Sequence, residues 1–176
     1  MRLFVALEVP GEVAQGFASW GAQIAVADPA LAPVAAEGLH VTMAFLGEST
    51  PDFVPGVADA VRAAAAPVPG LHAEEAVWLA PKRPHVLTAG LADDDGALGA
   101  IHAALWSGLV PLGFEPEVRP FRPHLTVARV RRGQRPRTLS VPDPPAERFP
   151  ALALTLMRSR LGGGQARYEP LERVLL

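Results

Sequence analysis

The sequence predicts an α+β fold made of two pseudo-symmetric lobes, each an antiparallel sheet with helices outside, and an active site in the cleft between them. Short apolar runs bounded by Gly or Pro, typical of strands, alternate with apolar stripes of helical period. A His-x-Thr-x tetrad lies inside one such run in each half of the chain, at residues 40–43 and 124–127. With 176 residues, of which 49% are hydrophobic and 19% charged, the chain fits one compact domain. We therefore expect a single bilobal domain over residues 1–176, each lobe contributing one tetrad.

The first half of the chain is predicted to contain two strands and two helices. Residues 2–9 are apolar on both faces and predict a central strand. A helix follows, because one apolar stripe recurs at helical spacing; it consists of Val13, Phe17, Trp20 and Ile24. Residues 31–38 are interrupted by Pro and Gly and predict a loop before the first tetrad strand. A second helix is expected to begin at residues 49–52, where hydroxyl side chains precede a Pro, and to end near Ala66.

The second half repeats this order with longer connections. Residues 71–79 and 85–91 predict two strands. Three aspartates, residues 93–95, precede a third helical stripe and suit a helix N-terminus; the stripe consists of Leu98, Ile101, Leu105 and Leu109. The second tetrad strand comes next, followed by an Arg- and Pro-rich connection to residue 148. Residues 151–160 and 167–175 predict the closing strands, joined by the glycines at 162–164.

The alternation of side chains along a strand gives each tetrad a polar face and an apolar face. His40 and Thr42 are expected on one face, with Val41, Met43 and Phe45 toward the core. The same alternation places His124 and Thr126 together on one face of the second strand. If the two strands face each other, two imidazoles and two hydroxyls converge in one pocket.

Such a pocket suits the cleavage of a phosphodiester. Imidazole titrates near neutral pH, so one His can take a proton from water while the other protonates the departing alkoxide. The two Thr hydroxyls can donate hydrogen bonds to the non-bridging phosphate oxygens. One tetrad alone is more simply explained as a chance occurrence of His and Thr in a half-buried strand. Two copies in matching strand contexts instead favour a shared site.

Composition narrows the remaining classes of function. The formal net charge is −2 and cysteine is absent, which argues against a general polyanion binder and excludes disulfides, a thiol nucleophile and Cys-based zinc sites. The apolar start is broken by Glu8 and Pro10, so we expect no targeting signal, no membrane association and a cytoplasmic protein. Neither tetrad has a carboxylate on its polar face, so we expect no metal and no cofactor.

The tetrads, the opening LFVAL, the segment FRPHLTVARV and the segment RSRLGGGQARYE resemble the bacterial and archaeal RNA 2′,3′-cyclic phosphodiesterases. This family was first described as 2′-5′ RNA ligases and belongs to the two-histidine phosphoesterase superfamily. The resemblance implies a bilobal α+β fold and metal-independent hydrolysis of RNA 2′,3′-cyclic phosphate ends to 2′-phosphomonoesters. It implies His40 as the proton donor to the 3′-oxygen, His124 as the base that activates water, and Thr42 and Thr126 as phosphate ligands. The expected partner is an RNA with a cyclic end, tRNA fragments being one candidate, and the expected state is a monomer.

Three further residues are candidates for substrate binding. Arg129 resembles a position thought to support the phosphate. Strand alternation puts it on the opposite face from Thr126, so it needs either a bulge or the reach of its side chain over the strand end. Phe4 and Tyr168 are candidate stacking surfaces for a base, although the core is the favoured place for Phe4. Ala44 stands where relatives often carry a basic residue, which weakens the expectation of a substrate contact there.

Several alternatives remain open at this point. An arginine cluster in residues 119–137 suits either an RNA backbone or a solvated loop, the loop being favoured for Arg135 and Arg137. His72 and His102 have no chemical partner in sequence, and the position of His85 relative to the pocket is open. Whether the enzyme also catalyses reversible 2′-5′ RNA ligation is open. The alternatives are a phosphodiesterase for small cyclic nucleotides, such as ADP-ribose 1″,2″-cyclic phosphate, and a non-catalytic RNA-end-binding protein.

Overall fold

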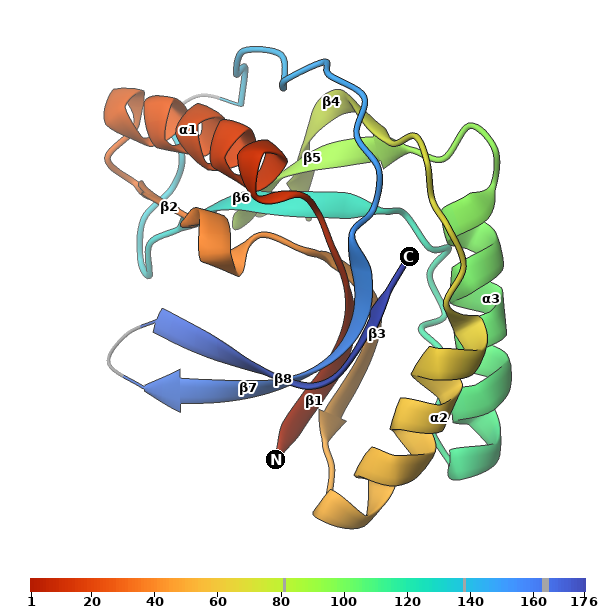
Figure 1. The fold of residues 1–176 in the computed structure, drawn as a ribbon. Helices are drawn as coiled ribbons and strands as arrows, with labels where there is room; N and C mark the ends of the chain where they lie inside the picture. The colour runs from red at the N-terminus through yellow and green to blue at the C-terminus, as the bar shows by residue number, and fades with distance from the viewer. Residues whose placement is uncertain (81, 138, 163–164) are drawn as a thin grey trace.

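The computed structural model describes residues 1–80, 82–137, 139–162 and 165–176. Over these residues eight strands form one antiparallel sheet in the order β4-β5-β6-β3-β1-β7-β8, with β2 paired to β6 (Figure 1). The strands are β1 (Arg2–Glu8), β2 (Leu31–Pro33), β3 (Val41–Glu48), β4 (His72–Leu79), β5 (Val86–Ala92), β6 (His124–Val130), β7 (Ala153–Gly162) and β8 (Gln165–Leu175). The helices are α1 (Gly11–Ala27), α2 (Val54–Ala64) and α3 (Ala97–Leu109), with 3₁₀ turns η1 (Ala36–Gly38), η2 (Pro51–Phe53) and η3 (Val110–Leu112). Gly163 and Gly164 of the predicted glycine turn lie outside the described residues.

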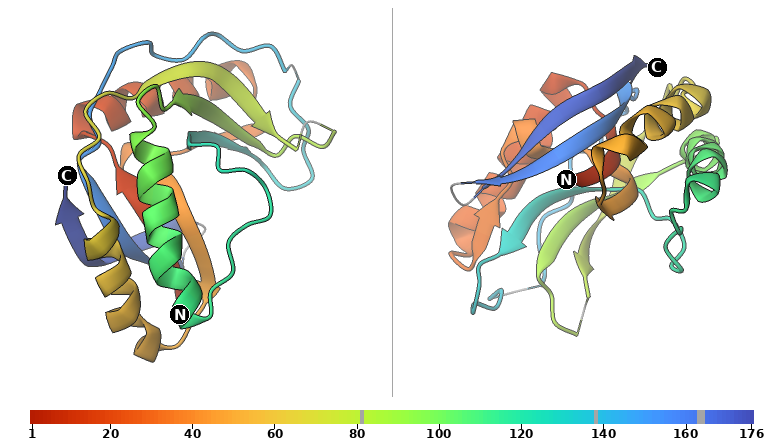
Figure 2. Two further views of the ribbon diagram at one scale, coloured as in Figure 1. Left: turned by 90° about the vertical axis from the view of Figure 1, so that its right-hand side faces the viewer. Right: turned by 90° about the horizontal axis from the view of Figure 1, so that it is seen from below.

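A single residue pair joins the two halves of the sheet. Val41 of β3 pairs with Leu125 of β6, and each of these strands otherwise pairs within its own half. Helix α1 packs on the half that holds β2 and β6, whereas α2 and α3 pack together over the other half (Figures 1 and 2). The predicted α+β class with antiparallel pairing is confirmed. The halves interleave in sequence, because β7 and β8 from the end of the chain join β1 and β3 from its start.

The helix and strand predictions hold where the apolar pattern is long. In α1 the predicted stripe buries Phe17, Trp20 and Ile24, and the whole predicted stripe of α3 is buried. Strand β1 lies between β3 and β7 with residues 3–7 buried, as expected for a central strand. Asp93 caps α3, its two carboxylate oxygens accepting hydrogen bonds from the backbone N–H groups of Leu98 and Gly99. None of the helices in the described part of the chain combines the length and apolar composition that a membrane crossing needs.

Two predicted boundaries differ in the structure. The loop expected at residues 31–38 contains β2 and η1, because the backbone of Ala32 pairs with that of Arg129 and Pro33 ends the strand at its edge. The helix expected from residues 49–52 begins instead as η2 and becomes α-helical only at Val54. Local propensity does not reveal either feature, since one depends on a distant strand and the other on a small difference in turn geometry.

Matching bulges interrupt the two tetrad strands. In β3, Thr42 pairs with Ala6 and Ala44 with Val5, so Met43 is an extra residue. In β6, Thr126 pairs with Thr88 and Ala128 with Leu87, so Val127 is the extra residue. Each extra residue is the fourth of its tetrad, and each bulge reverses the alternation of side chains that follows it.

The bulge in β3 overturns the expected orientation of Phe45. Met43 and Ala44 are both buried, 2% and 3% exposed, so two successive side chains face the core. Phe45 then emerges on the opposite face and is 48% exposed. The expectation that Phe45 belongs to the core is therefore wrong, because simple alternation does not survive the extra residue.

Candidate active site

The two tetrads come together at the point where the halves of the sheet join. His40 immediately precedes β3 and His124 begins β6, on either side of the pair between Val41 and Leu125. A cavity of about 70 Å³ opens there. It is lined by Val34, Gly38, His40, Thr42, His124, Thr126, Arg129 and Tyr168. All four predicted tetrad side chains, Arg129 and Tyr168 thus border one small polar pocket.

Both histidines are held by the same local contact. The Nδ1 of His40 lies 2.9 Å from the carbonyl oxygen of Gly38, and the Nδ1 of His124 lies 2.8 Å from that of Arg122. A carbonyl oxygen only accepts, so each Nδ1 carries the proton and donates it. In the neutral ring Nε2 is then the free acceptor, and in the charged ring Nε2 is a second donor. Each imidazole therefore has Nε2 available for proton transfer.

His40 is packed among aromatic rings. Its ring centroid lies 5.0 Å from that of Phe4 and 5.1 Å from that of Tyr168, which meets it edge-on. Burial lowers the pKa of His40 from 6.5 to about 4; the Gly38 hydrogen bond opposes this, and the nearby Arg129 and His124 add to the lowering. At neutral pH His40 is therefore uncharged.

Phe4 packs against two aromatic rings of the site but does not line the cavity. Its side chain is only 4% exposed and contacts both His40 and Tyr168. A ring so deeply buried offers no free face to a base, so the structure favours the core alternative for Phe4 over a stacking surface. Tyr168, on β8, does border the pocket.

The remaining polar groups of the pocket are free to bind an anion. Across the described part of the chain, no hydrogen bond occupies the hydroxyls of Thr42 and Thr126, and no carboxylate forms an ion pair with Arg129. Arg129 is exposed and reaches the cavity. Two hydroxyls and a guanidinium thus surround the space beside the two imidazoles, a suitable environment for a phosphate.

The bulge in β6 is what brings Arg129 to the pocket. Val127 and Ala128 both face the core, so Arg129 emerges on the same face as Thr126. The carbonyl of Val127 accepts a hydrogen bond from the backbone N–H of Val34, at 2.9 Å, which fixes the bulge against the segment after β2. Of the two routes that the sequence left open for Arg129, a bulge or the reach of its side chain over the strand end, the structure contains the bulge.

Phe45 does not line the cavity, but it lies on the same face of the sheet, where sequence reasoning did not expect it. It pairs across the strands with Phe4, so it shares the face of the sheet on which Phe4 contacts His40. Its ring is exposed and the Arg2 guanidinium carbon lies 5.4 Å from the ring centroid. Phe45 and Arg129 each lie five residues after the histidine of a tetrad, and this equal spacing is the feature of the sequence that links them.

The other histidines lie outside the lining of this cavity. His85 repeats the carbonyl contact, its Nδ1 lying 3.2 Å from the oxygen of Arg83, but it is exposed. His102 of α3 accepts a hydrogen bond from the indole of Trp106, and His72 approaches Asp94. The described residues contain no group of three or more His, Cys, Asp or Glu side chains placed to hold a metal ion.

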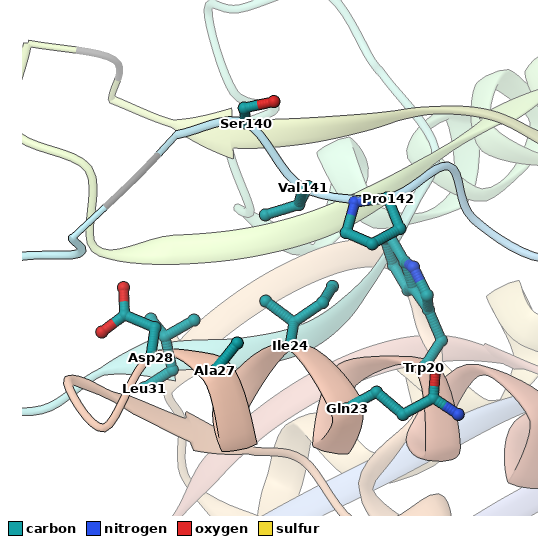
Figure 3. Close-up of a pocket in the computed structure, with 9 residues that line it drawn as sticks. All are labelled: Trp20, Gln23, Ile24, Ala27, Asp28, Leu31, Ser140, Val141 and Pro142. Carbon is teal, nitrogen blue, oxygen red and sulfur yellow. The ribbon is translucent and has the colours of Figure 1, made fainter.

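A larger cavity, of about 140 Å³, lies between α1 and residues 140–142 (Figure 3). Trp20 and Ile24 give it mainly apolar walls. Its one carboxylate, Asp28, is buried and already accepts hydrogen bonds from the backbone N–H groups of Ala30 and Arg137. It therefore has no acid–base pair, and the smaller polar pocket is the candidate active site.

Known proteins resemble this chain over most of its length. The model of the 2′-5′ RNA ligase superfamily matches residues 12–163. The chain is 29% identical over 174 residues to the RNA 2′,3′-cyclic phosphodiesterase of Escherichia coli (strain K12), covering 98% of this chain and 94% of that protein. It is 27% identical to the protein of the same name from Geobacillus stearothermophilus, covering 76% of this chain and 43% of that protein.

Solved structures share the fold over nearly the whole chain. Thermus thermophilus TT0787 superimposes with a TM-score of 0.86 at 24% identity, covering 100% of this chain and 98% of that one. Escherichia coli LigT in complex with 3′-AMP gives a TM-score of 0.80 at 28% identity, covering 99% and 97%. The likeness therefore includes both tetrad strands and the sheet that joins them.

Proposed function

Because the chain belongs to the 2′-5′ RNA ligase superfamily, we propose that it hydrolyses the 2′,3′-cyclic phosphate ends of RNA to 2′-phosphomonoesters by a two-histidine acid–base mechanism. The observation that carries the proposal is the single pocket bordered by His40, Thr42, His124 and Thr126. The names of the Escherichia coli and Geobacillus stearothermophilus relatives support the choice of substrate. We also propose that the protein acts in the reducing cytoplasm, since the chain contains no cysteine.

In the proposed reaction one water attacks phosphorus and the bond to the 3′-oxygen breaks. His124 acts as the base: its Nε2 takes a proton from the attacking water. His40 acts as the acid: its Nε2 gives a proton to the departing 3′-oxygen. The products are a 2′-phosphomonoester and a 3′-hydroxyl, and proton exchange with solvent restores both imidazoles.

The negative charge on the non-bridging oxygens needs fixed donors. Arg129 can donate two hydrogen bonds to a phosphate through its planar guanidinium. The hydroxyls of Thr42 and Thr126 add one donor from each tetrad strand. These groups are in place before the substrate binds, so little reorganisation accompanies the development of charge.

The lowered pKa of His40 fits the role of an acid that gains its proton only when the substrate binds. An acid must be protonated when the reaction occurs, and His40 with a pKa of about 4 is neutral in the empty pocket. A bound cyclic phosphate brings a negative charge beside the ring and offsets the charge of Arg129. Substrate binding is therefore expected to raise the pKa of His40 and to load the acid with its proton.

The terminal nucleoside has two candidate contacts near this phosphate. Phe45 presents an exposed ring on the same face of the sheet, and a base can stack on it. Tyr168 borders the pocket from the opposite strand pair and can contact the ribose or the base.

The direct test is turnover of a short RNA with a 2′,3′-cyclic phosphate end, with the position of the product phosphate assigned by ³¹P NMR. The expected product is the 2′-phosphate. Replacing His40 or His124 by Ala should lower kcat by about 10²–10⁴. His85→Ala is the matched control, because His85 makes the same backbone contact outside the pocket lining and its loss should leave kcat in place.

Three further measurements separate the alternative functions and mechanisms. Equal rates on a small cyclic nucleotide would indicate the small-molecule reading, and binding without turnover would indicate an RNA-end-binding protein. Loss of activity with excess EDTA, restored by zinc or manganese, would contradict the metal-independent mechanism. Supplying an RNA 5′-hydroxyl tests ligation, since a 5′-oxygen attacking in place of water forms a 2′-5′ linkage with the same departing 3′-oxygen.

A further inference from the structure

Arginine is distributed unevenly in this protein. Residues 118–142 contain seven arginines and no Asp or Glu, in a chain whose net charge is −2. The arginines of the other regions are largely neutralised: Arg62, Arg148, Arg160 and Arg173 each form an ion pair with a carboxylate at 2.6–2.9 Å. Among the described residues no such ion pair forms within 118–142. This positive charge is left for solvent or for a partner.

Part of this charge gathers at the end of β6 beyond the pocket. Arg129 borders the pocket, and the chain then turns at residues 131–134, where Gly133 has a φ of +77°. Arg132 on this turn and Arg135 directly after it are exposed. The neighbouring strand adds a charge from a distant part of the sequence, because the backbone N–H of Val130 donates to the carbonyl of His85, two residues after Arg83.

We name Arg83, Arg132 and Arg135 the basic edge. Its members lie on two turns that project from the same end of the sheet, next to β6, as the right-hand view of Figure 2 shows. The backbone beneath is anchored: the N–H of Arg131 donates to Ala30, that of Gln134 to Arg131, and that of Arg137 to the buried carboxylate of Asp28. The charges are therefore displayed from a fixed framework that continues from the phosphate pocket.

We infer that the basic edge binds the phosphates of the RNA strand that lies 5′ to the cyclic end. The inference rests on the proposed function, which places that end beside Arg129. Arginine suits this role because its guanidinium forms paired hydrogen bonds with phosphate. A single strand contacts such a surface without regard to its sequence, and its binding weakens with salt because counterions are released. The solvated-loop reading of Arg135 is the alternative under test.

The test compares two substrates, an RNA oligonucleotide with a 2′,3′-cyclic phosphate end and a 2′,3′-cyclic mononucleotide. The mononucleotide reaches the pocket only, so it reports on the pocket alone. The variant is Arg132→Gln/Arg135→Gln, and a second variant is Arg83→Gln. The matched control is Arg62→Gln/Arg119→Gln, which removes the same charge from two exposed arginines outside the basic edge. kcat/KM is measured for both substrates over a series of salt concentrations, with a melting curve for each variant.

The expected result is a drop in the ratio of oligonucleotide to mononucleotide kcat/KM for the basic-edge variants but not for the control. The slope of log kcat/KM against log salt for the oligonucleotide should become shallower by about 1.4 in the double variant, about 0.7 for each phosphate that an arginine no longer neutralises. An unchanged ratio and slope, or an equal effect in the control, would overturn the inference while leaving the proposed function intact. Absence of turnover on both substrates in the unmodified protein would instead refute the proposed function.

Discussion

Gly21 of α1 lies so close to the carbonyl of Val127 that a Cβ on Gly21 would stand 2.6 Å from the oxygen. Val127 is the extra residue of the bulge in β6, and the bulge is what turns Arg129 toward the pocket. A glycine on the outer helix therefore allows α1 to press against the backbone that shapes the active site.

Gly21→Ala should lower the free energy of unfolding, because the methyl group forces α1 away from β6. Overpacking of this kind costs about 1–3 kcal/mol. Gly16→Ala in the same helix is the matched control, since nothing lies within 4 Å of a Cβ there, and it should be neutral or stabilising by about 0.5–1 kcal/mol. Urea melts of both variants check this, and effects of the same sign would refute the close contact.

Arg129→Gln should lower kcat by about 10²–10³, the usual worth of one fixed donor to a developing anion. Arg129→Lys should recover only part of the loss, because an ammonium lacks the planar pair of donors. Melting temperatures should hardly change, since Arg129 is exposed and forms no ion pair with a described carboxylate. A Lys variant as active as the unmodified protein would mean that only the charge at this position matters.

The sequence contained enough to predict the helices, the antiparallel class and the tetrads. Long apolar stripes such as that of α3 depend on periodicity alone, which is visible in one dimension. The convergence of His40 and His124 on one cavity was predictable because two copies of one motif in matching strands favour a shared site.

The missed features all depend on contacts distant in sequence. Strand β2 exists because β6 pairs with it, and no local propensity predicts a three-residue edge strand. The bulges at Met43 and Val127 shift the alternation by one residue, so the face of Phe45 was predicted incorrectly and that of Arg129 stayed open. The burial of Phe4 agrees with the core alternative, which the sequence favoured over a stacking surface.

Phe45→Ala should raise KM for the RNA substrate roughly tenfold, because stacking of one base on an aromatic ring is worth about 1–3 kcal/mol. Phe45→Tyr should retain binding, since the ring face is preserved. Phe53→Ala is the control, because its ring is 38% exposed and lies on η2 rather than on a strand of the pocket face. Equal losses in the two Ala variants would mean that Phe45 acts through stability rather than through a base.

The lowered pKa of His40 makes stability depend on pH. The unfolded chain binds a proton at His40 near pH 6.5, whereas the folded protein does so only near pH 4. Between these values the unfolded state holds more protons, so the free energy of unfolding falls as the pH is lowered from 6.5 toward 4. His40→Gln removes this contribution, at most about 3 kcal/mol. Urea melts at pH 7.5 and 4.5 should show a smaller loss in the variant, and identical losses would contradict the burial of a neutral imidazole.

The same group predicts the shape of the pH–rate profile. The reaction needs one imidazole protonated and the other neutral, so kcat/KM, which reports the free enzyme, should rise as the pH increases to about 4, the pKa of His40, and should not continue to rise above it. kcat reports the complex, where the phosphate charge raises that pKa, so its ascending limb should lie at higher pH. Exchanging the roles of His40 and His124 gives the same profile, because the product of the protonated and neutral fractions has the same form for both assignments. Rates on the cyclic-ended RNA from pH 3.5 to 8.5 check the profile, and a kcat/KM that still rises between pH 5 and 6 would contradict a buried, neutral His40.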